Sequence, residues 1–128
     1  NPLPNYVVAE HFLKNNLEAK GVRFRKNEII YTGVDTDFFT RNRVGGAKDK
    51  FTFLQIAILA ERKGQAVTLE AFKRFLSKES DPSKYQLIIA GGMEGNYGKE
   101  VRQMPEQMGI SANVIFHDWI IREQAREL

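Results

Sequence analysis

The segment Phe51–Leu59 reads FTFLQIAIL, and it decides the fold. It is nearly all apolar and rich in residues that favour β-strands, which is typical of a parallel strand buried on both faces. Apolar residues then recur at helical spacing between Gln65 and Ser77, so we expect a helix there. A second apolar run, Tyr85–Ala90, predicts a second buried strand that ends in two glycines.

The same alternation continues toward the carboxyl end. Apolar residues from Val101 to Met108 predict a second helix, which Pro105 is expected to bend unless it lies in the first turn. Asn113–Phe116 predicts a third buried strand, and Arg122–Leu128 reads as the start of another helix. Strands that alternate with helices through short connections predict an α/β fold. Its parallel sheet of three or four strands would carry helices on both faces, in three α/β/α layers.

The first forty residues follow a different pattern. Between Tyr6 and Lys20 the apolar residues recur at helical spacing, and Gly21 suits the position just past a helix end. Glu28–Tyr31 predicts a short strand that runs into a loop. Arg41–Lys50 is charged and contains two adjacent glycines, so we expect a loop there as well.

Composition narrows the classes of protein to which the chain can belong. The 128 residues are 42% hydrophobic, enough for a buried core, and they contain no cysteine for disulfides or thiolate metal sites. No apolar run approaches the roughly 20 residues of a membrane-spanning helix. The formal net charge is +3, but lysine and arginine are scattered among acidic residues, so we do not expect a nucleic-acid partner.

Ligands of open parallel sheets bind beyond the carboxyl ends of the strands, where the sequence places three loops. The first, Ala60–Gly64, reads AERKG and opens a helix. A helix N-terminus favours phosphate, Arg62 and Lys63 add cationic groups, and Gly64 allows close approach of the backbone. Taken alone, this loop is more often a solvated basic turn.

The other two loops carry weaker signals. Gly91 and Gly92 permit a tight turn, but their spacing fits neither a P-loop nor a dinucleotide fingerprint. His117 and Asp118 follow the third strand, and neighbours on a strand point to opposite faces, so we do not expect them to act as an acid–base pair. Trp119 is expected to serve packing, and no metal-binding set is evident.

Taken in order, these segments resemble the family 4 glycosyltransferases of the GT-B fold, over nearly the whole chain. In that family one loop is close to Pro-Asn-Gly-Val-Asp, and a strand ending Gly-Arg-Leu is followed three residues later by Lys-Gly. A further strand ends in a glycine-rich turn, and the last reads Val-x-Phe-x-Gly. The corresponding segments here are YTGVD at 31–35, AILAERKG at 57–64, LIIAGG at 87–92 and VIFHD at 114–118.

The resemblance implies an enzyme with two Rossmann-like domains. Residues 1–40 would form the end of the N-terminal domain and the interdomain segment, and residues 41–128 the first part of the C-terminal nucleotide-sugar-binding domain. A sugar would pass from a nucleotide-sugar donor to a sugar, lipid or glycan acceptor with retention of configuration, without an obligatory metal or other cofactor. Neither Asn1 nor Leu128 looks like a natural terminus, so we expect a piece of a longer protein that is inactive alone.

The resemblance also implies site residues. Lys63 falls on the lysine with which the family binds the donor diphosphate. The family's neighbouring arginine is Ile58 here, and the glycine of the last motif is Asp118. No residue is assigned a catalytic role. The expected site comprises a phosphate-binding loop of Arg62, Lys63 and Gly64, a donor loop of Gly91, Gly92, Trp119 and Ile120, and an interdomain motif of Gly33 and Asp35.

Two alternatives stay open. One is another GT-B enzyme, such as a sugar-nucleotide epimerase or a glycogen-synthase-like enzyme. The other is a flavodoxin-like regulatory or interaction domain, although a receiver domain would need an acidic cluster at the strand ends, and the first long strand ends Ile58-Leu59-Ala60. We expect a cytoplasmic location, with peripheral binding to the cytosolic face of a membrane as an open option.

Overall fold

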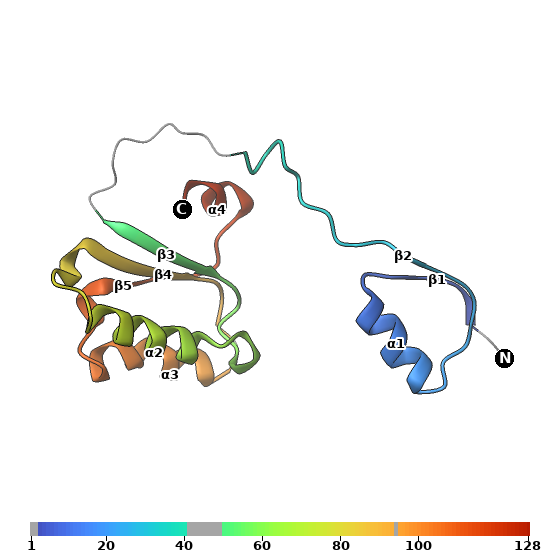
Figure 1. The fold of residues 1–128 in the computed structure, drawn as a ribbon, viewed down its shortest axis with the longest axis horizontal. Helices are drawn as coiled ribbons and strands as arrows, with labels where there is room; N and C mark the ends of the chain where they lie inside the picture. The colour runs from blue at the N-terminus through green and yellow to red at the C-terminus, as the bar shows by residue number, and fades with distance from the viewer. Residues whose placement is uncertain (1–2, 41–49, 94) are drawn as a thin grey trace. The chain divides into compact units, whose positions relative to one another are not determined.

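The structure is a computed structural model that describes residues 3–40, 50–93 and 95–128. The chain divides into two compact units, Asn1–Arg41 and Asn42–Leu128, which are described separately (Figure 1). The loop expected at Arg41–Lys50 falls outside the described residues at 41–49. None of the helices in the described part combines the length and apolar character needed to cross a bilayer.

The first unit is a β-α-β arrangement. Strands β1 (Leu3–Val8) and β2 (Phe24–Ile29) pair in parallel, and helix α1 (His11–Ala19) connects them. Gly21 has a φ of 83°, as expected of a glycine just past a helix end.

The prediction that a helix begins at Tyr6 was wrong, because α1 begins at His11. Residues 6–8 belong to β1, where β-branched Val7 and Val8 pair with Glu28 and Ile29 of β2. The short apolar run there was too brief to distinguish a strand from a helix by spacing alone. Strand β2 likewise begins before the expected Glu28 and ends at Ile29.

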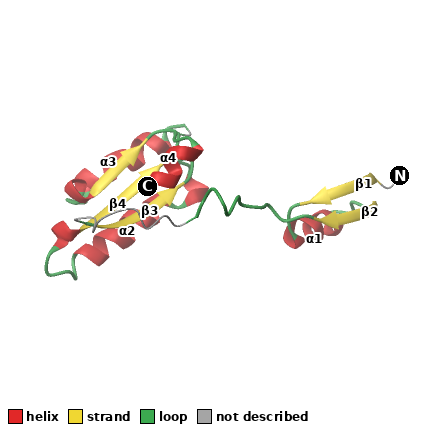
Figure 2. Ribbon diagram, turned by 90° about the horizontal axis from the view of Figure 1, so that it is seen from above, coloured by secondary structure: helices red, strands yellow, loops and turns green. Residues whose placement is uncertain are grey.

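The second unit confirms the expected parallel α/β sheet. Its strand order, β3-β4-β5, follows the chain, and all pairs are parallel. Helices α2 and α3 lie along one face of the sheet, and the short α4 lies on the opposite side (Figures 1 and 2). The elements are β3 (Phe51–Ile56), α2 (Gln65–Leu76), β4 (Tyr85–Ala90), α3 (Tyr97–Gln107), β5 (Val114–His117) and α4 (Arg122–Glu127).

The core lies between the sheet and the two longer helices. It forms because α2 and α3 each turn one apolar stripe toward the same face of the strands. Each fully buried aliphatic or aromatic side chain contributes about 1.5–3 kcal/mol to this packing. The buried cluster comprises Leu59, Leu69, Phe72, Leu76, Leu87, Ile89, Val101 and Ile110.

The expectation that β3 is buried on both faces was wrong. Leu54 and Ile56 are 41% and 47% exposed, whereas Leu87–Ala90 of β4 is buried throughout. In the described sheet β3 is an edge strand, and only its other face packs against α2, so a continuous apolar run did not distinguish an edge strand from a central one. Pro105 lies in the last turn of α3 rather than the first, and Gly109, with a φ of 71°, follows the helix.

Candidate functional site

Three loops meet at the carboxyl edge of the β3-β4-β5 sheet. Backbone hydrogen bonds extend the strand pairing past the ends of the strands. The amide of Ala57 donates to the carbonyl of Ala90 (2.9 Å), and that of Leu59 donates to the carbonyl of Gly92 (2.7 Å). The amide of Gly91 donates to the carbonyl of His117 (3.1 Å). The loops after β3, β4 and β5 are therefore joined by backbone hydrogen bonds.

The two glycines of the middle loop do different things. A Cβ on Gly91 would lie 2.1 Å from the carbonyl oxygen of Ala57, far inside contact distance, so no larger residue fits while the loops stay joined. A Cβ on Gly92 would meet only the indole of Trp119, at 3.5 Å from its Cε3 atom, which is an ordinary contact. Gly91 therefore holds the loops together, whereas Gly92 faces the exposed surface beside Trp119.

The loop after β3 presents the two cations. Glu61–Lys63 forms a short 3-10 helix, η1, which ends at Gly64 with a left-handed φ of 70°, and α2 begins at Gln65. The side chains of Arg62 and Lys63 are exposed. The sequence therefore placed these cations correctly at the start of a helix that follows a strand.

Two glutamines fix the path of this loop, and the sequence analysis missed both. Gln55 Nε2 donates to the carbonyl of Lys63 (2.9 Å), and Gln65 Nε2 donates to the carbonyl of Ile58 (2.8 Å). Gln65 is fully buried, and the Oε1 atoms of both side chains are buried without a partner in the described part. A polar residue inside the apolar run of β3 was the available signal, because a buried amide needs a hydrogen-bond partner.

One backbone amide at the N-terminus of α2 already has a hydrogen-bond partner on another helix. The amide of Ala66 donates to the hydroxyl of Tyr97, the first residue of α3, at 3.3 Å. This contact brings the starts of α2 and α3 together at the carboxyl edge of the sheet. It also satisfies one of the amides that a helix N-terminus leaves unpaired.

The loop after β5 carries an exposed tryptophan. Trp119 is 77% exposed, so the expectation that it serves packing was wrong, while Ile120 beside it is half-buried. Asp118 forms an ion pair with Arg102 of α3, with 2.5 Å between Oδ1 and Nη2. His117 is the last residue of β5, and Asp118 is the first residue after that strand.

Gly33 and Asp35, which the resemblance predicts to be an interdomain motif, lie in the first unit. Asp35 Oδ1 accepts a hydrogen bond from the amide of Phe38 (2.9 Å), and the Asp35 carbonyl accepts one from the amide of Phe39 (3.0 Å). Asp35 thus closes a local turn, as aspartate often does. Gly33 has open space around the position of a Cβ.

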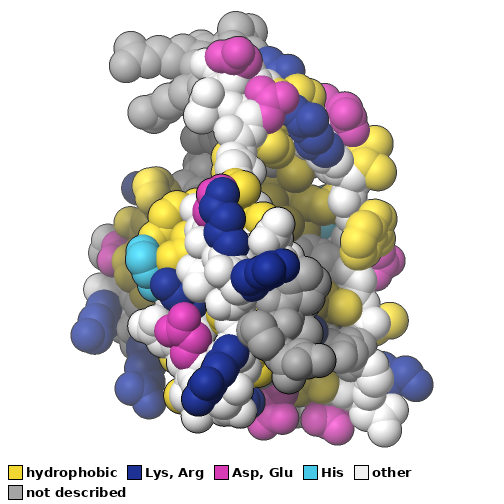
Figure 3. All heavy atoms as spheres, turned by 90° about the vertical axis from the view of Figure 1, so that its right-hand side faces the viewer, with side chains coloured by type: hydrophobic (Ala, Val, Ile, Leu, Met, Phe, Trp, Pro, Cys, Tyr) yellow, Lys and Arg dark blue, Asp and Glu magenta, His cyan; other side chains and the backbone are white. Residues whose placement is uncertain are grey.

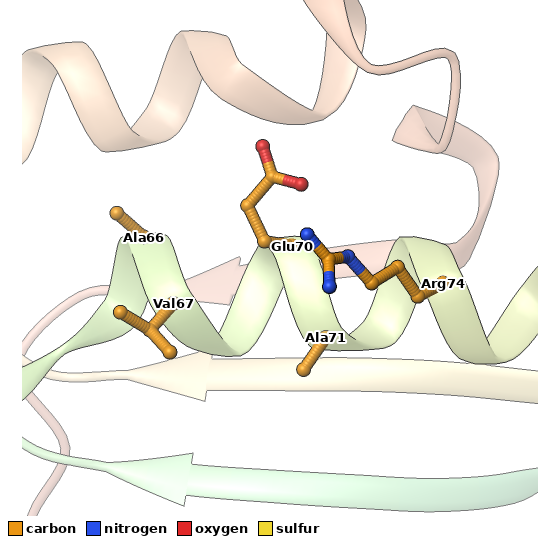
Figure 4. A pocket seen from close by; sticks show the side chains of 5 residues that line it. All are labelled: Ala66, Val67, Glu70, Ala71 and Arg74. Carbon is orange, nitrogen blue, oxygen red and sulfur yellow. The ribbon is translucent and has the colours of Figure 1, made fainter.

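A shallow hollow of about 360 Å³ lies elsewhere, on α2. Figure 4 shows that the side chains lining it all project from this one helix. It contains none of the residues of the three loops, so it does not mark the site. The lining residues are Ala66, Val67, Glu70, Ala71 and Arg74.

Among the described residues, no group of three or more His, Cys, Asp or Glu side chains is arranged to hold a metal ion. On the face shown in Figure 3, Lys and Arg side chains are interspersed with Asp and Glu.

Comparisons with known proteins fit this geometry. The family model described as glycosyl transferases group 1 matches residues 37–128. HepE from Anabaena, in complex with UDP and glucose, is similar in structure, with a TM-score of 0.75 and 19% identity over 90% of this chain and 33% of that one. A glycosyltransferase from Rickettsia africae is also similar in structure, with a TM-score of 0.77 and 14% identity over 94% of this chain and 34% of that one. No curated protein matches the sequence.

The solved structures and the family model support different statements. At these identities the structures show a shared fold, that of GT-B glycosyltransferase domains, and the chain spans about one third of their length. The family model covers most of the sequence, including all three loops at the carboxyl edge. The chain therefore belongs to the group 1 glycosyl transferases.

Proposed function

We propose that this chain binds the nucleotide-sugar donor of a retaining glycosyltransferase of family 4. The observation that carries the proposal is the joining of the Lys63 loop to the glycine loop within the segment that matches the family. The UDP bound to the structurally similar HepE supports a nucleoside diphosphate as the leaving group.

The proposed chemistry is electrostatic. When the sugar leaves, negative charge grows on the diphosphate, and preorganised cations stabilise it. Lys63 and Arg62 would supply these cations, while Gly64 lets the phosphate approach the start of α2. The loop keeps its shape without the Lys63 side chain, because Gln55 holds the Lys63 carbonyl oxygen, which any residue would supply.

The remaining predicted residues are proposed to surround the donor. Gly91 joins the loops, and Gly92, Trp119 and Ile120 would line the base or sugar. Gly33 and Asp35 belong to the proposed interdomain motif. The acceptor would be a sugar, lipid or glycan. The chain spans about one third of the solved structures that it matches, so we propose that these 128 residues bind donor but do not complete transfer.

The test is a Lys63→Ala variant of the complete enzyme. Loss of one anion-stabilising group is worth roughly 2–4 kcal/mol, so turnover should fall by about two orders of magnitude or more. Thermal stability should change little, because an exposed lysine contributes under about 0.5 kcal/mol. The matched control is Lys78→Ala, which removes an exposed lysine just past the other end of α2.

Four outcomes would count against the proposal. Wild-type turnover in Lys63→Ala would remove Lys63 from phosphate binding, and a large loss of stability would make it a structural residue instead. Transfer that stops when a chelator is added would contradict the absence of an obligatory metal. Transfer catalysed by the 128-residue chain alone would contradict the proposal that these residues bind the donor but do not complete transfer.

A further inference from the structure

Arg102 reaches from α3 to the loop that follows β5. Its Nη2 atom lies 2.5 Å from Asp118 Oδ1, and its guanidinium carbon lies 5.2 Å from the centre of the Phe116 ring. The arginine therefore contacts the last strand and the loop at once, through a charged hydrogen bond and a cation–π contact.

These contacts are better suited to orient the loop than to stabilise the fold. The Asp118 side chain is 80% exposed, and exposed ion pairs contribute little to folding stability. The Arg102 side chain is only 28% exposed, and its Nε atom is buried without a hydrogen-bond partner in the described part. A buried donor without a partner is unfavourable, which offsets what the ion pair gains.

The residue held in place is Trp119, next to Asp118 in the chain. Its indole lies against Gly92 and is otherwise largely exposed. The backbone bond between Gly91 and His117 keeps the two loops together on the other side of Asp118. The indole is thus a flat apolar surface, anchored at its base and open to solvent, and such surfaces stack on planar rings.

We propose that Arg102 is a positioning residue, which through Asp118 holds Trp119 over Gly92 as a platform for the base of the donor nucleotide. The identity of the ligand rests on the proposed function, whereas the positioning of Trp119 by Arg102 does not. Asp118 stands where the resembled family has glycine, so the device uses a residue particular to this sequence. Fixing a loop and a ring before binding lowers the entropy that binding must remove.

Trp119 is the single tryptophan of the 128 residues, so its fluorescence reports on this loop directly. The variants are Arg102→Gln, Asp118→Asn and the double variant, with Arg102→Lys as the conservative exchange. Lys99→Gln is the matched control, because it removes an exposed cation from the same helix. The measurements are fluorescence anisotropy without ligand, titration with UDP and GDP, and thermal unfolding.

We expect lower anisotropy in Arg102→Gln and Asp118→Asn, and five- to tenfold weaker nucleotide binding, about the effect of freeing one ordered side chain. The double variant should be no worse than either single one, since both remove the same contact. Arg102→Lys should recover part of the binding, and Lys99→Gln should match wild type.

The two parts of the proposal fail differently. Unchanged anisotropy in Arg102→Gln would overturn the positioning role whatever the nucleotide titration shows. A wild-type chain that binds neither UDP nor GDP would overturn the proposed ligand, and with it the proposed function, while the anisotropy would still decide whether Arg102 holds Trp119. Binding of free glucose with the same dependence on Arg102 would assign the platform to the sugar instead of the base.

Discussion

The two ends of the β3-β4-β5 sheet carry different kinds of residues. At the amino end, aromatic rings pack edge to face: Phe75 lies 5.3 Å from Phe53 and 4.8 Å from Tyr85, measured between ring centres. At the carboxyl end, two glycines, an exposed tryptophan and two exposed cations follow the strands. The rings at the amino end contact each other, whereas the indole and the two cations at the carboxyl end are exposed to solvent.

This difference teaches which residues to associate with stability and which with binding. Packed rings contribute to folding through buried area and ring contacts. Exposed cations and an exposed indole contribute almost nothing to folding, so their placement is better explained by a ligand. The comparison predicts that substitutions at the amino end change stability alone, and that most substitutions at the carboxyl end change binding alone.

Gly91 is the exception, and its substitution should have the largest effect. In Gly91→Ala the new methyl group would clash with the Ala57 carbonyl oxygen, so the β3 and β4 loops must separate. We expect a loss of about 3 kcal/mol, at the upper end of the range for overpacking. Chemical denaturation measures it. Gly92→Ala is the control, expected within about 0.5 kcal/mol, and an equal loss in both variants would contradict the assigned contacts.

Phe75→Ala tests the amino end. The half-buried ring contacts Phe53, Phe72 and Tyr85, so its removal should lower the free energy of unfolding by about 2–3 kcal/mol, less than a fully buried phenylalanine. Nucleotide affinity should not change. Val67→Ala, which removes an exposed apolar side chain from the same helix, is the control. Weakened nucleotide binding in a folded Phe75→Ala protein would break the comparison.

Asn113 closes the amino end between β4 and β5. Its Nδ2 atom donates to the carbonyls of Pro82 (2.8 Å) and Tyr85 (2.9 Å). Asn113→Asp keeps the size but cannot donate when ionised, so we expect a loss of about 1–2 kcal/mol at neutral pH. The loss should shrink when the new carboxyl is protonated. A variant as stable as wild type at neutral pH would show that these two bonds do not matter.

The smallest expected effect is electrostatic. The Ser83 hydroxyl donates to Asp81, at 2.5 Å, and lowers the pKa of that carboxyl below its ordinary 3.8. A lowered pKa stabilises the fold above the unfolded value and loses this contribution as pH falls through the folded value. Asp81→Asn should therefore melt slightly below wild type at pH 7 and equal to it in strong acid. A difference in melting temperature between Asp81→Asn and wild type that stays constant with pH would rule out this charge effect.

Much of the second unit could be predicted from the sequence. Strand β4 matches the expected Tyr85–Ala90, and α2 begins at the expected Gln65, because their patterns are long and one-sided. The start of the first unit could not be predicted, since three residues at Tyr6–Val8 are too few for a reliable period. Exposure of β3 was missed because an apolar run does not reveal which strand lies at an edge.

The site could be predicted only where its residues lie close together in the sequence. Lys63 and Gly64 could be placed because a strand, a loop and a helix succeed one another. The contact between Arg102 and Asp118 joins a half-buried helix residue to a loop 16 residues further along the chain, and no local pattern indicates such a pair. The hydrogen bonds of Gln55 and Gln65 to backbone carbonyls are equally invisible, because any residue supplies the acceptor.

The strand order has a consequence for synthesis on the ribosome. Each strand of the second unit pairs with the next one in the chain, so β4 can dock on β3 as soon as β4 itself has emerged. Domains commonly fold in this direction during translation. Until β5 is made, the far edge of β4 is open, and open edges invite pairing with other chains. We therefore expect this edge to be open to pairing with other chains between the synthesis of Ala90 and that of His117, the last residue of β5.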